Sequence, residues 1–163
     1  MLVHKVIASP VGQLKLVASD RGLKAVLWEE GNPARVPLDA SRESGSHPFL
    51  AQAEIQLGQY FAGERHDFQL PLDFAGTVFQ QIVWRALLDI RYGETCSYEN
   101  LAHRIGKPTA HRAVGAANGR NPISIIVPCH RVLGKNGALT GFAGGLGAKT
   151  YLLNLERRCS DAE

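Results

Sequence analysis

Cys129, His130 and Arg131 stand in consecutive positions and carry side chains suited to nucleophilic chemistry. The apolar run 123–127 before them predicts a buried strand, and Pro128 favours the first position of a helix. Cys129 would then begin a turn or helix, where unpaired N–H groups favour an anion. We therefore predict a lowered pKa for the Cys129 thiol and a catalytic role for it. A buried and inert cysteine is the competing interpretation.

Glu156 is the carboxylate expected to complete this site. It lies on a predicted helix from Lys149 to Arg157 and could orient His130 by accepting its second ring proton. Adjacent side chains seldom share a face, so we expect a water molecule to couple Cys129 to His130. A surface glutamate paired with a nearby lysine or arginine is the alternative.

Two short helices joined by Gly-Lys-Pro are predicted in residues 97–118. Ser97 is a suitable N-cap for the first helix, and Gly106 with Pro108 would end it. Thr109 is predicted to cap the second helix. This arrangement is typical of a helix-turn-helix.

The second of these helices has an unusually small surface, because most of its residues are alanine or glycine. Arg112 is the one long side chain near its middle. A helix packed tightly against its neighbours, with Arg112 solvated, is one interpretation. The other is a helix that enters a DNA groove and inserts a single cation.

The charge distribution also points to a polyanionic partner. Residues 1–75 hold seven basic and nine acidic residues, and residues 76–163 hold eleven and six. Between Asn100 and Leu155 there are seven basic residues and no acidic one. A stretch of this length that carries only positive charge favours a nucleic-acid partner, because a solvated face usually mixes positive and negative charges.

The composition bounds the class of protein. A chain of 163 residues with 45% hydrophobic residues can bury the core of one domain, or of one domain and a small partner. No apolar run reaches the ~18 residues that span a bilayer, so no membrane association is expected. The start also lacks the apolar stretch of a signal peptide. Three widely spaced cysteines argue against a disulfide framework and predict a cytoplasmic location, with no role for Cys96 or Cys159.

The remaining pattern predicts the elements that position the site. Alternating apolar residues indicate three strands within the first thirty residues, followed by a polar loop over 31–47. A helix over 49–61 that ends at Gly63 and a strand over 66–74 are then expected. Thr77 and Gln80 form a capping box for the next helix. We predict two domains, residues 1–75 and 76–163.

The segment Ile-Val-Pro-Cys-His-Arg-Val at 126–132 resembles the active-site signature of the O6-alkylguanine-DNA alkyltransferases (methylated-DNA–protein-cysteine methyltransferases). The resemblance is dense over 76–157 and loose before it. It implies an α/β (α+β) fold with an N-terminal ribonuclease-H-like, strand-rich domain and a mainly helical C-terminal domain with a helix-turn-helix. Other segments in family order are 92–94, 97–98, 112–118, 121–122, 139–145, Lys149 and 152–153.

The family resemblance implies direct reversal of DNA damage. Alkylated guanine is flipped out of duplex DNA, and its alkyl group moves irreversibly to a cysteine, once per molecule; O4-alkylthymine is a second expected substrate. By position, Cys129 would be the acceptor and His130 would deprotonate it through water. Glu156 would orient His130, and Asn121 would brace the turn that holds the cysteine.

The resemblance also implies the residues that contact substrate. Tyr98 would bind the flipped base, and Arg112 would fill the space it leaves in the stack. The pocket would include Val132, with Phe142, Ala143 and Gly144 in a closing loop. The other residues expected at DNA are Thr109, Ala110, Ala113, Ala117 and Asn118.

Three departures from the family pattern qualify the resemblance. Position 142 is Phe where Tyr is common, which removes a hydroxyl. His111 precedes Arg112 where a small residue is usual. The first domain has no cysteine, so we predict no zinc, no other metal and no cofactor.

Alkylated duplex DNA is the expected partner, and no obligate protein partner is implied; cooperative self-association on DNA is left open. Two other functions compete with this interpretation. Alkyltransferase-like proteins only bind alkylated DNA, but they lack the acceptor cysteine that Cys129 provides here. A Cys-His hydrolase would need an oxyanion hole, and the helix-turn-helix and basic surface argue against it.

Overall fold

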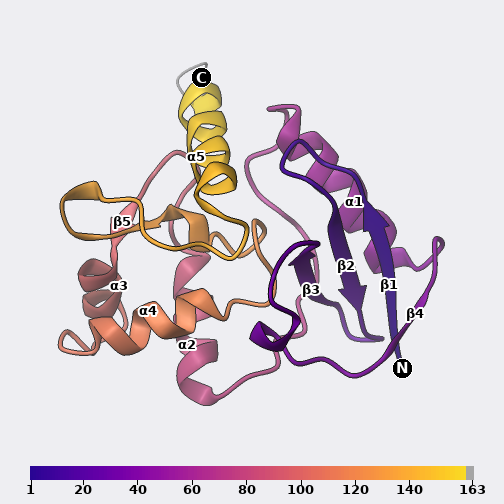
Figure 1. Cartoon of the computed structure of the whole chain (residues 1–163), viewed down its shortest axis with the longest axis horizontal. Helices are drawn as coiled ribbons and strands as arrows, with labels where there is room; N and C mark the ends of the chain where they lie inside the picture. The colour runs from indigo at the N-terminus through magenta and orange to yellow at the C-terminus, as the bar shows by residue number, and fades with distance from the viewer. Residues whose placement is uncertain (161–163) are drawn as a thin grey trace.

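A computed structural model of the protein describes residues 1–160. A strand-rich N-terminal unit lies beside a helical C-terminal unit (Figure 1). Within residues 1–160, no helix is both long enough and apolar enough to cross a bilayer.

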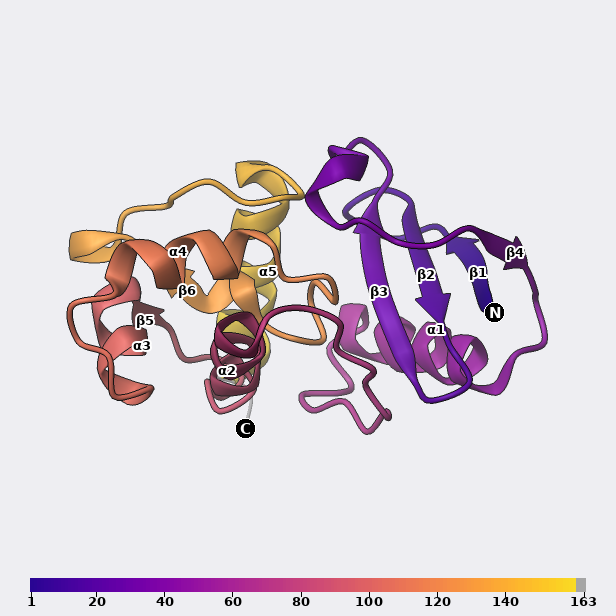
Figure 2. The ribbon, with the colours of Figure 1, turned by 90° about the horizontal axis from the view of Figure 1, so that it is seen from below.

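The N-terminal unit is built on the predicted three-stranded meander. Strands β1 (Leu2–Ile7), β2 (Leu14–Ala18) and β3 (Leu23–Trp28) pair antiparallel, and a short β4 (Ser41–Glu43) adds to β1 in parallel. The strand order is β3-β2-β1-β4. Helix α1 (Pro48–Phe61) lies along one face of the sheet (Figure 2). Ala62 is its C-cap, and the following Gly63, predicted to end the helix, adopts a left-handed φ of 78°.

The C-terminal unit contains four α-helices among the described residues: α2 (Val78–Leu87), α3 (Tyr98–Arg104), α4 (His111–Gly119) and α5 (Leu146–Ser160). Short strands β5 (Cys96–Ser97) and β6 (Val132–Leu133) pair in parallel beside them. Three-residue 3-10 helices occur at η1 (Pro33–Arg35), η2 (Cys129–Arg131) and η3 (Lys135–Gly137). The predicted capping box is confirmed, since Thr77 and Gln80 each accept a hydrogen bond from the other's backbone N–H.

Two predicted strands are not strands. Segment 66–74 runs beside the start of β3 with a single bridge between Leu23 and Leu72, because Pro71 has no N–H to donate to a ladder. Segment 123–127 is buried as predicted, but it folds into turns: Ile126 N–H donates to Ser124, and Ile125 has a φ of 74°. The predicted loop over 31–47 in turn contains η1 and β4.

The caps of α3 and α4 differ in how well the sequence predicts them. The Ser97 hydroxyl accepts a hydrogen bond from the Asn100 N–H, and Gly106 takes a left-handed φ of 75° after α3. Thr109 is not the cap of α4, so that prediction is wrong. The Ala110 N–H closes a turn onto the Lys107 carbonyl, so the helix begins at His111 with Ala110 as its N-cap. The methyl side chain of Ala110 cannot make a capping hydrogen bond.

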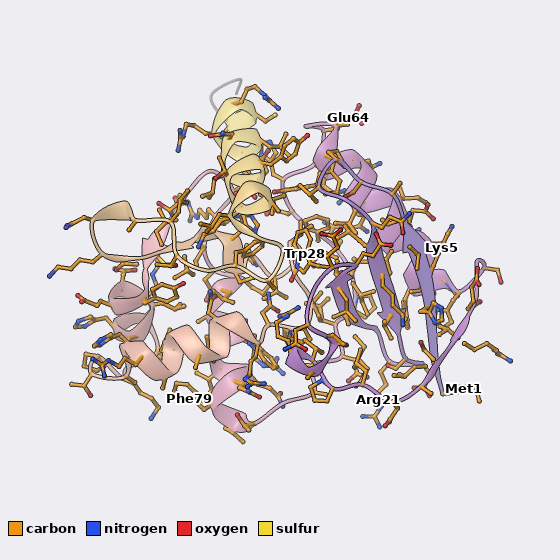
Figure 3. All side chains as sticks on the ribbon, viewed as in Figure 1. Met1, Lys5, Arg21, Trp28, Glu64 and Phe79 are labelled. Atoms are coloured by element: carbon orange, nitrogen blue, oxygen red, sulfur yellow. The ribbon has the colours of Figure 1, made fainter. Side chains whose placement is uncertain are left out.

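The two units share one continuous hydrophobic core. Strand β3 is the edge of the sheet nearest the helices (Figure 2). Its Val26 N–H donates to Pro122, and the indole of Trp28 donates to the Ser124 hydroxyl at 3.1 Å. Trp28 lies near the middle of the molecule (Figure 3). The N-terminal unit is therefore packed directly against the segment that leads to Cys129; a domain boundary at 75/76 stays a prediction.

Candidate active site

Cys129 is the first residue of η2 and is only 4% exposed. Pro128 is the N-cap rather than the first helical residue, and the Cys129 N–H already donates to the Val127 carbonyl at 2.8 Å. Burial raises the pKa of the Cys129 thiol, and Asn121 and nearby cations offset this only in part. The predicted lowering of this pKa is therefore wrong, because desolvation outweighs the helix start. The thiol needs a base to become a thiolate.

His130 is placed to be that base. Its Nε2 lies 2.7 Å from Oε2 of Glu156, and both side chains are buried. Burial lowers the pKa of His130 while Glu156 opposes the shift, so the imidazole is neutral at pH 7. A neutral ring that donates from Nε2 to a carboxylate carries its lone pair on Nδ1. Nδ1 is buried and has no hydrogen-bond partner within residues 1–160, so it is free to accept a proton.

Glu156 is held as a carboxylate. Burial alone would raise its pKa, but His130 and Arg131 outweigh burial and lower the pKa to about 2. Arg131 donates from Nε to Oε1 at 2.7 Å and from Nη2 to Oε2 at 3.0 Å. At 1% exposure, Glu156 is not the surface residue of the alternative interpretation.

Asn121 spans the turn that leads to the cysteine. Its Nδ2 donates to the Val127 carbonyl at 2.8 Å, and its Oδ1 accepts from the Ile123 N–H at 3.0 Å. Both bonds are buried and close the turn from its two ends. The side chain is thus positioned as the brace that the resemblance implies.

Tyr98 and the predicted closing loop lie together. The Tyr98 hydroxyl and Thr140 Oγ1 are 2.7 Å apart, which joins the start of α3 to the loop. Further along the loop, Phe142 meets Trp28 edge to face at 5.4 Å between ring centroids. Phe142, Ala143 and Gly144 are half-buried here, and Val132 is fully buried.

Helix α4 presents a narrower exposed face than predicted. Thr109, Arg112 and Ala113 are exposed and Ala110 is half-buried, as DNA contact requires. Ala117 and Asn118 are instead buried on the core side of the helix. The indole of Trp84 donates to the Ala117 carbonyl at 2.8 Å, so these two positions face away from any groove that receives α4.

Several residues of the site had no role assigned from the sequence. Arg35 donates to the carbonyls of Gly119 and Asn121 at 3.1 and 2.9 Å, although it comes from the polar loop after β3. Lys149 is fully buried and donates to the Val132 carbonyl at 2.7 Å. No periodic pattern in the sequence assigns Arg35 to the site. For Lys149, its position among the segments that follow the family order was the available sequence signal.

The basic stretch divides into two groups. Arg131 and Lys149 are buried within the site, whereas Arg104, Lys107, Arg112, Arg120 and Lys135 are exposed. The exposed group remains available for phosphates. Among the described residues, no cluster of three or more His, Cys, Asp or Glu is arranged to hold a metal ion.

Comparisons with known proteins agree with this geometry. The family model for the ribonuclease-like domain of 6-O-methylguanine DNA methyltransferase matches residues 2–74, and the model for its DNA binding domain matches 78–158. The methylated-DNA–protein-cysteine methyltransferase of Methanosarcina acetivorans is 47% identical over 158 residues, which cover 97% of this chain and 100% of the relative. That of Mycobacterium tuberculosis is 47% identical over 167 residues, which cover 100% and 97%.

A solved structure extends the likeness to three dimensions. The crystal structure of Mycobacterium tuberculosis OGT in complex with DNA superposes with a TM-score of 0.89 at 45% identity, covering 96% of this chain and 94% of that one. The chain belongs to the 6-O-methylguanine DNA methyltransferase family. The family and fold class expected from the sequence are confirmed.

Proposed function

We propose that Cys129 is the acceptor through which this protein repairs alkylated DNA. The protein moves the alkyl group of O6-alkylguanine to one of its own cysteines, once per molecule. The observation that carries the assignment is that buried Cys129 is followed directly by His130, whose Nε2 lies 2.7 Å from Glu156 Oε2 and whose Nδ1 has no hydrogen-bond partner within residues 1–160. Cys96 and Cys159 are half-buried, whereas Cys129 is buried next to the His130–Glu156 pair.

The transfer step follows from this arrangement. His130 takes the thiol proton of Cys129 at Nδ1, through a water molecule, and Glu156 stabilises the imidazolium that forms. The sulfur attacks the alkyl carbon, so an S–C bond forms and the C–O6 bond breaks. Guanine leaves with the electron pair of that bond and takes up a proton, which balances the proton lost by the thiol. The thioether cannot be reversed, so each molecule acts once.

Access to the lesion requires extrusion of the base from duplex DNA. Extrusion costs a few kcal/mol, which an inserted side chain offsets in part. Arg112 is exposed on α4, where the small residues Ala113, Gly115 and Ala116 that follow it allow close approach to a groove. Tyr98 and the loop 139–145 then receive the base, and the helix-turn-helix formed by α3 and α4 docks on the duplex with help from the exposed cations. O4-alkylthymine is a second substrate of this pocket, and the cytoplasm is the expected location.

Intact-mass spectrometry tests the assignment directly. After incubation with duplex DNA containing O6-methylguanine, the protein should gain one methyl group on the peptide that holds Cys129. Cys129→Ala should gain none, whereas Cys96→Ala and Cys159→Ala should react like the parent protein. Methylation at another residue, or several turnovers per molecule, would refute the proposal.

A further inference from the structure

Tyr60 is a buried residue of the N-terminal unit that reaches the catalytic chain. It lies in the last turn of α1 and is 0% exposed, with Phe61, Phe68 and Tyr92 around its ring. Its position in an apolar helical stripe indicates only a core residue. In the structure, however, its hydroxyl donates to Oε2 of Glu156 at 2.5 Å, across 96 residues of sequence.

The acceptor of this hydrogen bond is the same oxygen that holds His130. Oε2 also accepts from His130 Nε2 at 2.7 Å and from Arg131 Nη2 at 3.0 Å. Tyr60 and His130 therefore share one carboxylate oxygen. A purely structural tyrosine could place its hydroxyl on any carbonyl of the core, but this one acts on the atom that orients the base.

We propose that Tyr60 is a positioning residue for alkyl transfer, whose hydroxyl fixes Glu156 and restrains the negative charge that Oε2 presents to His130. This proposal rests on the proposed function, in which neutral His130 accepts the proton of Cys129. Burial and the neighbouring carboxylate raise the pKa of Tyr60 well above its ordinary value, so the hydroxyl is a donor at every pH of interest. The N-terminal unit thus takes part in the chemistry through one hydrogen bond.

Within residues 1–160, the other charged and titratable groups around this oxygen come from three places. Arg131 lies in η2, Lys149 and Glu156 lie in α5, and Tyr92 lies between α2 and β5. Arg131 is also anchored by its Nη1, which donates to the Ile90 carbonyl at 2.6 Å. Removal of the Tyr60 hydroxyl leaves all of these groups in place, so its effect can be separated from theirs.

The consequence of removing the hydroxyl has a definite sign. A carboxylate oxygen that loses a donor carries more negative charge towards its remaining partners, and this favours the imidazolium form of His130. The pKa of His130 then rises, and His130 becomes protonated, and inactive as a base, at a higher pH. The acid limb of the pH–rate profile should move with it.

Tyr60→Phe tests this, because it removes the hydroxyl and keeps the ring. The probe is O6-benzylguanine as the free base, which needs the pocket but not duplex binding. The rate of alkyl transfer to Cys129 is measured from pH 5 to pH 9. We expect the acid limb to move to higher pH by about 0.5–1 unit, so that the rate at low pH falls roughly three- to tenfold while the rate at high pH stays close to the parent value.

Tyr92→Phe is the matched control. It also removes one buried hydroxyl, and its ring lies 6.1 Å from that of Tyr60. The Tyr92 hydroxyl neighbours Cys159, and no hydrogen bond joins it to Glu156 within residues 1–160. Its pH–rate profile should coincide with that of the parent protein. A Tyr60→Phe profile that also coincides with the parent, or that is lowered by one factor at every pH, would overturn the proposal.

An NMR titration of the His130 ring separates this proposal from the proposed function. The titration midpoint should rise in Tyr60→Phe and stay unchanged in Tyr92→Phe, whether or not transfer is observed. If Tyr60→Phe does not fold, replacement of tyrosine by 3-fluorotyrosine, a stronger donor, should lower the midpoint instead. A midpoint that moves in neither sample overturns the role of Tyr60, whereas failure of the parent protein to accept an alkyl group overturns the role of Cys129.

Discussion

Gly144 lies directly on the indole of Trp28, which joins the loop beside the pocket to strand β3 of the other unit. A Cβ at position 144 would come within 2.7 Å of three atoms of that ring. Such a distance is far inside van der Waals contact, so any larger side chain must move either the loop or the indole. The indole cannot move freely, because its Nε1–H donates a hydrogen bond to the Ser124 hydroxyl in the turn before Cys129.

Gly144→Ala is therefore expected to displace the loop. We predict a loss of roughly tenfold or more in the rate of transfer from free O6-benzylguanine, since small misplacements in a pocket are costly to rate. Gly141→Ala is the control from the same loop, because a Cβ at 141 meets nothing within 4 Å. Single-turnover kinetics measure the transfer rate of both variants. Equal rates would show that Trp28 does not set the position of the loop.

Glu156→Gln should destabilise the protein strongly. The amide keeps the size of the side chain but leaves Arg131 buried without its counter-charge, which costs about 3–5 kcal/mol. Urea denaturation at pH 7 measures this loss. The ion pair between Lys5 and Glu54 is a contrast, because its side chains are 32% and 42% exposed. Glu54→Gln should cost about 0–1 kcal/mol, and a similar cost for Glu156→Gln would contradict the view that Glu156 neutralises a buried charge.

Much of the architecture could be predicted from the sequence because it depends on local rules. The meander, α1, and the Thr77–Gln80 capping box follow from alternation, helical spacing and capping. Segment 123–127 differs from the predicted strand because an apolar run predicts burial but not conformation, and Ile125 is left-handed there.

The sequence predicts which residues form the site better than it predicts their chemical properties. The proximity of His130 and Glu156 follows the triad pattern, but the pKa of Cys129 depends on how completely distant segments cover the thiol. Arg35 and Tyr60 reach the site from loops and helices of the other unit, and no short-range pattern connects them to it. Likewise, Ala117 fits a groove-facing helix by size alone, and only the packing of Trp84 shows that it faces inward.

The stability of the folded protein should decrease as the pH falls below 6.5. Burial lowers the pKa of His130 from its ordinary 6.5. Below pH 6.5 the unfolded chain binds a proton at this position and the folded protein does not, so protonation favours unfolding. The contribution is thus present above pH 6.5 and is lost as the pH falls, at up to about 1.4 kcal/mol per pH unit. Urea denaturation between pH 7 and pH 5 measures this slope.

His130→Gln should flatten that part of the pH dependence. His103→Gln replaces an exposed histidine of α3 and should leave the slope as it is in the parent protein. A slope that is the same in all three proteins would mean that His130 titrates alike in the folded and unfolded states.

Arg112→Ala should separate base extrusion from the chemistry of transfer. Arg112 is exposed on α4, and no hydrogen bond to the pocket ties it to Cys129 or His130 in the described structure. The rate with free O6-benzylguanine should therefore change little. Repair of O6-methylguanine in duplex DNA should fall by a much larger factor, because the side chain that offsets the cost of extrusion is lost.

Lys107→Ala distinguishes this role from simple attraction to phosphate. It removes the same charge from an exposed position in the turn between α3 and α4. A phosphate contact weakens binding uniformly and reduces the salt slope by about one, so low salt should restore repair in Lys107→Ala. Low salt should not restore repair in Arg112→Ala, because extrusion is limited by the missing side chain rather than by affinity. Equal losses of the Arg112 variant on free base and duplex, or full rescue by low salt, would show that Arg112 only contacts the backbone.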